Sequence, residues 1–134
     1  MLESDPSSVI HAVLCRAGLT RPDARPAMHP LSGGVSSDIW KVELADRAVC
    51  VKRALAKLKV EADWRAPLER SAFEAAFLET AGRIVPGAVP ALLHYDRIAG
   101  ALVMPYLDPA DHRLWKAELA SGRAEPEVAA AVGA

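Results

Sequence analysis

The sequence predicts an α+β fold: a five-stranded antiparallel sheet with one helix inserted after the third strand, flanked by N- and C-terminal helices. Two patterns lead to this prediction. Apolar and polar residues alternate around Trp40, Val42 and Leu44 and again over 48–53, which is the period of a β-strand. Over 67–81 the apolar residues recur at helical spacing, so an amphipathic helix should follow the first strands.

Composition limits the classes of function. The chain has 134 residues and a formal net charge of -1, so one domain is expected, without the basic field that nucleic acids or anionic membranes attract. Its two cysteines, Cys15 and Cys50, have no CxxC spacing and suit a reducing compartment. The N-terminus lacks the pattern of a signal peptide, and no run reaches the roughly 18 apolar residues of a membrane span. We expect a cytoplasmic protein.

The first half of the chain is expected to form a helix and three strands. The helix covers 7–18, with Ser7 or Ser8 as its cap, and three prolines make 21–30 a linker. A strand ends at Leu31. A hairpin then forms around a turn at 45–47, with its second strand over 48–53.

The second half is expected to begin with the inserted helix. Pro67 suits its first turn and Gly82 its end. The predicted buried stripe consists of Phe73, Ala76, Phe77 and Ala81. Strands over 91–96 and 101–106, a helix over 109–119 capped by Asp108, and a last helix over 127–132 complete the fold.

A glycine-rich loop precedes the hairpin, with the sequence Ser32-Gly33-Gly34-Val35-Ser36-Ser37. Paired glycines let the backbone turn tightly, so successive N–H groups can surround an anion, and the serine hydroxyls add donors. The loop therefore fits a phosphate site. A Gly-Gly hairpin turn without a ligand fits the same residues.

Three more residues extend the candidate site. Cys50 and Lys52 share one face of their strand because side chains alternate, and a lysine on an inner face needs a partner anion. Glu74 on the following helix is the candidate partner, which would hold the Lys52 ammonium on a phosphate. Cys50 would be a small residue under a flat ligand such as adenine. Taken singly, Lys52 also reads as a lysine that extends to water, and Glu74 as a solvated helix residue.

The order of glycine loop, strand lysine and helix glutamate resembles the N-terminal lobe of aminoglycoside phosphotransferase and methylthioribose kinase-like proteins over roughly 28–121. The similarity also includes Asp38, the stretch 63–70, and a hinge at Met104-Pro105-Tyr106-Leu107-Asp108. The resemblance implies that the Pro105 carbonyl and the Leu107 N–H bind adenine while Met104 borders the pocket. The loop differs from the G-x-G-x-x-G of protein kinases.

The resemblance implies ATP as the cofactor and a small-molecule acceptor, with sugars, amino alcohols and aminoglycosides all open. Its catalytic His-Gly-Asp is absent from the sequence, so no catalytic residue or magnesium ligand is expected here. We expect an N-terminal helix and linker (1–25), a nucleotide-binding lobe (26–108) and the helical start of a missing second lobe (109–134). The alternatives are a non-catalytic interaction module that forms a homo-oligomer through its exposed lobe face, and an unrelated small α+β domain.

Overall fold

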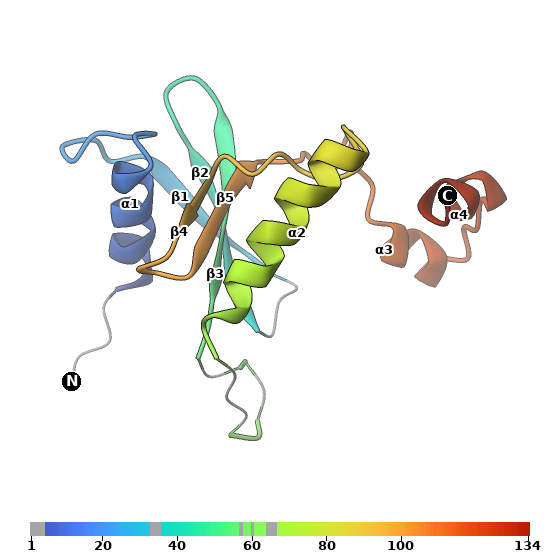
Figure 1. Ribbon diagram of the computed structural model, residues 1–134, viewed down its shortest axis with the longest axis horizontal. Helices are drawn as coiled ribbons and strands as arrows, with labels where there is room; N and C mark the ends of the chain where they lie inside the picture. Colours follow the sequence, from blue (N-terminus) through green and yellow to red (C-terminus); the bar gives the residue numbers. More distant parts are fainter. Residues whose placement is uncertain (1–4, 33–35, 57, 60, 64–66) are drawn as a thin grey trace.

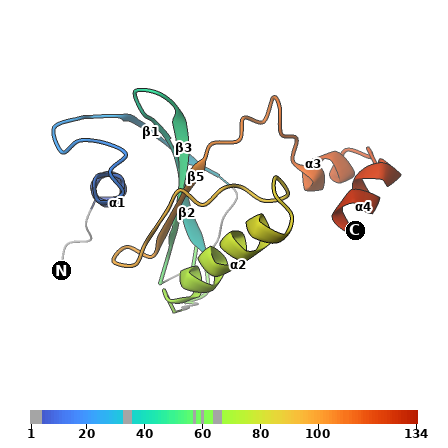
Figure 2. The ribbon, with the colours of Figure 1, turned by 45° about the horizontal axis from the view of Figure 1, so that its top comes forward.

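The computed structural model describes residues 5–32, 36–56, 58–59, 61–63 and 67–134, and within them the predicted α+β fold is confirmed. The strands form one sheet in the order β1-β2-β3-β5-β4, and every neighbouring pair is antiparallel. The strands are β1 (Ala27–Leu31), β2 (Ser37–Glu43), β3 (Ala48–Ala54), β4 (His94–Asp96) and β5 (Ala101–Pro105). The helices are α1 (Pro6–Arg16), α2 (Arg70–Ile84), α3 (Trp115–Ala120) and α4 (Pro126–Val132). Helices α1 and α2 lie on opposite sides of the sheet (Figures 1 and 2).

The apolar core lies between α1 and one face of the sheet. Helix α1 contributes Ile10, Val13 and Leu14, and the strands contribute alternate residues. These strand residues are Val42, Val49, Val51, Ala101 and Val103. The helix is capped by the side chain of Asp5, which accepts a hydrogen bond from the Ser8 N–H at 3.3 Å, so the expected serine cap is wrong.

An ion pair holds the C-terminal end of α1 against β4. Arg16 donates from Nε and Nη2 to the two carboxylate oxygens of Asp96, at 2.7 and 3.0 Å. Asp96 also accepts a hydrogen bond from the Ala99 N–H at 2.9 Å. Burial alone would raise the pKa of Asp96, but the hydrogen bonds from Arg16 and Ala99 outweigh it and hold the pKa below its usual value. The bidentate contact therefore fixes α1 on the sheet.

Strand β1 corrects the prediction that 21–30 is only a linker. Residues 27–30 belong to this strand, and Pro30 lies opposite Trp40 of β2. A proline is tolerated here because β1 is an edge strand, where a missing N–H can face solvent. The prediction that a strand ends at Leu31 is confirmed.

Helix α2 is displaced from its predicted position and turns a different face to the sheet. It begins at Arg70 rather than Pro67 and continues through Gly82 to Ile84. Phe73 and Phe77, predicted to be buried, are 77% and 62% exposed. The side chains withdrawn from solvent instead form a stripe that begins two positions earlier: Ser71, Glu74, Ala75 and Leu78. Small residues in this stripe let the helix approach the strands closely.

Ser71 joins the start of α2 to the far edge of the sheet. It is 2% exposed, and its Oγ donates to the Leu68 carbonyl at 2.9 Å and lies 3.1 Å from the Tyr95 Oη. Gly100, in the β4–β5 turn, has a φ of +61°, and a Cβ there would lie 3.4 Å from the Ser71 Oγ. Glycine is therefore favoured here by the positive φ of the turn, which a side chain would strain.

The C-terminal segment differs from its predicted boundaries. Asp108 does not cap a helix over 109–119: its Oδ1 accepts from the Ala110 N–H at 2.9 Å within a tight turn, and α3 begins only at Trp115. Strand β4 likewise begins at His94 rather than at residue 91. Neither α3 nor α4 has a buried residue, and both lie away from the sheet (Figure 1). No helix among the described residues has the length and apolarity of a membrane span.

Candidate functional site

The face of the sheet opposite α1 presents two rows of side chains across β2, β3 and β5. One row pairs Lys41, Cys50 and Met104, and the next pairs Ile39, Lys52 and Leu102. The intervening residues of β3, Val49 and Val51, point into the core under α1. Strand alternation thus places Cys50 and Lys52 together on the face that α2 partly covers, as the sequence indicated.

Lys52 and Glu74 form the central ion pair of this face. The Lys52 Nζ lies 2.6 Å from the Glu74 Oε1, and their side chains are 30% and 37% exposed. A contact this short between half-exposed groups fixes the direction of the ammonium while leaving it accessible. The expected pairing of strand lysine and helix glutamate is therefore present in the structure.

A cavity of about 180 Å³ adjoins the ion pair. Its lining residues are Ser36, Ser37, Lys52, Ala54, Arg70, Ser71, Glu74 and Leu102. The serines at the end of the glycine loop therefore lie beside the lysine. Ser32, at the other end of the loop, is exposed and is not part of this lining. Gly33, Gly34 and Val35 lie outside the described residues.

Arg70 is a member of the site that the sequence did not reveal. Its Nη1 donates to the Pro67 carbonyl at 2.6 Å, and its Nη2 donates to the carbonyls of Leu55, at 2.7 Å, and Ser36. Arg70 therefore ties α2 to the end of β3 and to the glycine loop. One signal was available: a basic residue in the first turn of a helix opposes the helix dipole, which suggests that specific partners hold it there.

Cys50 and Met104 form the apolar part of the site, next to the hinge. Burial raises the pKa of the Cys50 thiol, and the nearby charge of Lys52 only partly offsets this, so the thiol stays protonated at neutral pH. Pro105 ends β5. The Leu107 N–H, two residues on, makes no hydrogen bond with any residue that the structure describes, and Leu107 is exposed. We call the surface formed by Cys50 and Met104 the apolar floor of the site. The Leu107 N–H, which has no partner among the described residues, is therefore a free donor in the hinge that follows Met104 in the sequence.

Asp38 belongs to the opposite face of β2. It accepts hydrogen bonds from the Trp40 Nε1 at 2.8 Å, the Lys59 Nζ at 3.2 Å and the Arg53 Nη2 at 3.3 Å. Burial alone would raise the pKa of Asp38, but its bonds to Trp40 and Lys59 and the charge of Arg53 hold that pKa below its usual value. Asp38 is thus a structural anion that neutralises two basic side chains, apart from the cavity.

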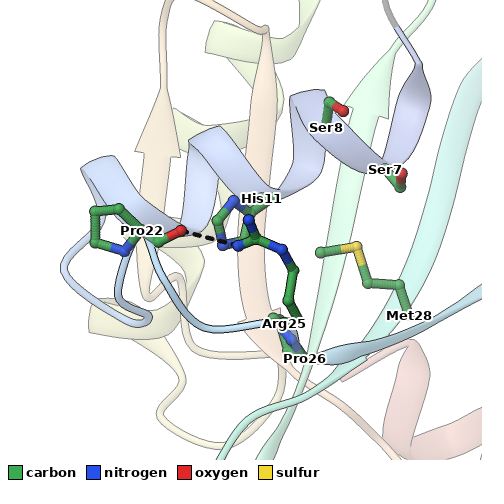
Figure 3. Close-up of a pocket in the computed structure, with 7 residues that line it drawn as sticks. All are labelled: Ser7, Ser8, His11, Pro22, Arg25, Pro26 and Met28. Carbon is green, nitrogen blue, oxygen red and sulfur yellow. Dashed lines mark hydrogen bonds between the residues drawn. The ribbon is translucent and has the colours of Figure 1, made fainter.

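A second cavity, of about 450 Å³, lies on the α1 side of the molecule (Figure 3). Its polar side chains already have partners. Ser7 and Ser8 donate to the carboxylate of Asp5, and Arg25 donates from Nη1 to the carbonyls of Pro22 and Ala24, both at 2.9 Å. This cavity therefore offers less chemistry than the smaller one at Lys52. Among the described residues, no group of three or more His, Cys, Asp or Glu could hold a metal ion.

The fold and the ion pair are consistent with one class of protein. A five-stranded antiparallel sheet whose third strand carries a lysine paired with a glutamate of the next helix is consistent with the nucleotide-binding lobe of kinase-like proteins. The chain is similar to curated methylthioribose kinases. It is 30% identical to that of Pectobacterium carotovorum over 119 residues, which is 87% of this chain and 29% of the relative.

Two further methylthioribose kinases are also similar to the chain. The methylthioribose kinase of Pectobacterium atrosepticum is 29% identical over 119 residues (87% of this chain, 29% of the relative), and that of Yersinia enterocolitica is 37% identical over 82 residues (60% and 20%). The chain thus spans less than a third of the length of these curated relatives. No family model matches it. These relatives support a kinase-like family for the chain.

Proposed function

We propose that this chain is the ATP-binding lobe of a small-molecule phosphotransferase. The observation that carries the proposal is the Lys52–Glu74 pair beside a cavity bordered by Ser36 and Ser37. An ammonium held in one direction by a carboxylate can donate to phosphate oxygens without first losing rotational freedom. Polyphosphate at this end of the sheet therefore matches the polar groups present.

The size of the cavity and the charge of the site support a pose in which the triphosphate and the adenine base of ATP bind at two different parts of the sheet face. A cavity of about 180 Å³ is smaller than the roughly 300 to 1,000 Å³ of typical ligand pockets, so it matches the triphosphate and not the whole nucleotide. The base would lie along the sheet on Cys50 and Met104, whose neutral, partly buried side chains suit a flat aromatic ring. The Pro105 carbonyl and the Leu107 N–H would bind the adenine edge.

Transfer of phosphate is proposed for the whole protein and not for residues of this chain. The sequence contains no His-Gly-Asp, so we assign no residue here to accept the proton of the acceptor hydroxyl. The methylthioribose kinase relatives favour a sugar-type acceptor over an aminoglycoside. A cytosolic location belongs to the same proposal, because Cys15 and Cys50 are both free thiols.

Binding of ATP and magnesium, measured by thermal stabilisation and by titration calorimetry, tests the proposal. A ligand that binds only the folded chain raises its melting temperature. Lys52→Met should lower the affinity by about tenfold or more, because a charge-assisted hydrogen bond contributes about 1.5–3 kcal/mol. Lys116→Met, which removes an exposed lysine of α3, is the matched control and should bind like the wild type.

Two results would contradict the proposal. One is no stabilisation of the wild-type chain by millimolar ATP. The other is equal affinity of wild type and Lys52→Met, since binding would then lie elsewhere. Circular dichroism of both variants separates loss of binding from loss of fold.

A homodimer that uses the outer face of α2 is the second candidate function. Phe73 and Phe77 lie one turn apart and are both largely exposed, and Ile84 continues the apolar surface toward the end of the helix. Exposed clusters of this kind favour association. Under this alternative, the mass measured by analytical ultracentrifugation rises with concentration, and Phe73→Ser/Phe77→Ser abolishes the rise. A monomer at all concentrations would exclude it.

A further inference from the structure

Lys41 is a cation on the same face as Lys52, at the opposite end of the candidate site. In the register of the sheet it lies across from Cys50, which pairs in turn with Met104. Lys52 lies one row further, beside the cavity, because residues two apart on a strand share a face. One lysine thus adjoins the proposed phosphate end and the other adjoins the apolar floor.

The Lys41 ammonium contacts the hinge. Its Nζ lies 4.5 Å from the centroid of the Tyr106 ring, within the range of a cation–π interaction. Among the described residues, the nearest carboxylate oxygen is that of Glu43, 3.9 Å away and beyond hydrogen-bond distance. The side chain of Lys41 is only 28% exposed, so its stem covers the sheet while its charge faces the ring.

Tyr106 lies between the two groups that would bind adenine, Pro105 and Leu107. Its own N–H donates to the Ala48 carbonyl at 3.2 Å, which continues the β3–β5 ladder by one residue. The backbone bond and the ring contact together hold Tyr106 against β3 and β2. The direction of the next N–H, that of Leu107, depends on this hold.

We propose that Lys41 is a positioning residue for base recognition: its contact with Tyr106 holds the hinge so that the Leu107 N–H points along the floor formed by Cys50 and Met104. This inference rests on the proposed nucleotide site, and it assigns different roles to the two lysines of that site. Lys52 acts on phosphate, whereas Lys41 acts on the base through Tyr106. Removing the Lys41 charge should therefore weaken the binding of ATP but not that of inorganic tripolyphosphate.

Calorimetric titration of the chain with ATP and with tripolyphosphate tests the proposal. Lys41→Met keeps the stem and removes the charge, and it should weaken ATP about two- to fivefold, the factor that corresponds to an exposed cation–π contact. Its affinity for tripolyphosphate should stay at the wild-type value. Tyr106→Leu should reproduce this split, and the double variant should be no weaker than either single one. Lys41→Arg and Tyr106→Phe, which keep cation and ring, should restore ATP binding.

A readout without ligand completes the test. Hydrogen exchange of the Tyr106 amide should be faster in Lys41→Met than in wild type or Lys41→Arg, because the hinge is held less firmly. Equal loss of ATP and tripolyphosphate in Lys41→Met would overturn the proposal, since Lys41 would then act on phosphate. Unchanged ATP affinity with unchanged exchange would overturn it too. A wild-type chain that binds neither ligand would instead refute the nucleotide site, and the exchange rates would still decide whether Lys41 holds the hinge.

Discussion

The Ser71 Oγ lies 3.1 Å from the Tyr95 Oη, and this contact joins the first turn of α2 to β4 at the far edge of the sheet. Glu74 follows Ser71 by three residues and lies on the same side of the helix. The depth at which Ser71 packs therefore sets the distance from Glu74 to Lys52. Tyr95, which does not line the cavity, thus influences the geometry of the ion pair through Ser71, which does.

Ser71→Ala and Tyr95→Phe should each destabilise the chain by about 1 kcal/mol, the usual contribution of one hydrogen bond. The double variant should cost less than the sum, since both changes remove the same contact. Urea unfolding followed by circular dichroism measures the three values. Additive costs would show that the hydroxyls do not interact. Ser121→Ala removes an exposed hydroxyl that follows the end of α3, away from this contact, and is the control.

Glu74→Gln should weaken ATP about fivefold, because the neutral amide no longer holds the Lys52 ammonium in place. Glu79→Gln removes an exposed carboxylate from the same helix and controls for net charge and helix propensity. Calorimetric titration of both variants with ATP tests this prediction. Equal effects of the two substitutions would mean that Glu74 acts only through the overall charge.

Gly82→Ala should stabilise the chain by about 0.5–1 kcal/mol, since α2 continues through this residue and alanine costs less entropy in a helix. A Cβ at Gly82 would lie an ordinary 3.8 Å from the Val89 Cγ2. Gly87→Ala should destabilise instead, because Gly87 has a φ of +84°. Thermal unfolding of both variants compares them. Destabilisation by Gly82→Ala would place the helix end where the sequence pattern predicted it.

Acid should weaken the attachment of α1 through Asp96. The folded pKa of Asp96 is below its ordinary value of 3.8, so the unfolded chain binds more protons in acid and stability falls as the pH drops through this value and below. Asp96→Asn should cost about 1–3 kcal/mol at pH 7, and its difference from wild type should shrink at pH 3. Urea unfolding at both pH values measures this. A constant difference would contradict the assignment, and Asp111→Asn, at an exposed aspartate, is the control.

Strand β3 shows how much of the site a sequence pattern can predict. Alternation alone indicated that Cys50 and Lys52 share a face, and the register confirms it. Helix α2 shows the limit. Periodicity selected the stripe with Phe73 and Phe77 because these side chains are the most apolar, but the structure withdraws Ser71 and Ala75. Helix packing on a crowded sheet rewards small size, which a hydrophobicity pattern does not register.

Arg70 shows a second limit. Among its partners are the backbone carbonyls of Ser36, Leu55 and Pro67, and every residue has such a carbonyl. No side-chain pattern marks an acceptor of this kind, so only the folded path of the chain reveals it. The pairing of Lys52 with Glu74 was predictable for the opposite reason, because both partners carry charge that needs neutralising.

Strands β2, β3 and β5 have different functions on their two faces: one face packs against α1, and the other carries the candidate site. Among the largest fully buried side chains that the structure describes, those of the strands lie under α1, with Leu102 as the exception on the α2 side. The polar groups that the strands contribute to the candidate site, such as Lys52, therefore lie outside the main apolar core. Selection can change these groups, and so the ligand, without endangering the fold. A single inserted or deleted residue in β3 would exchange the two faces and damage both at once.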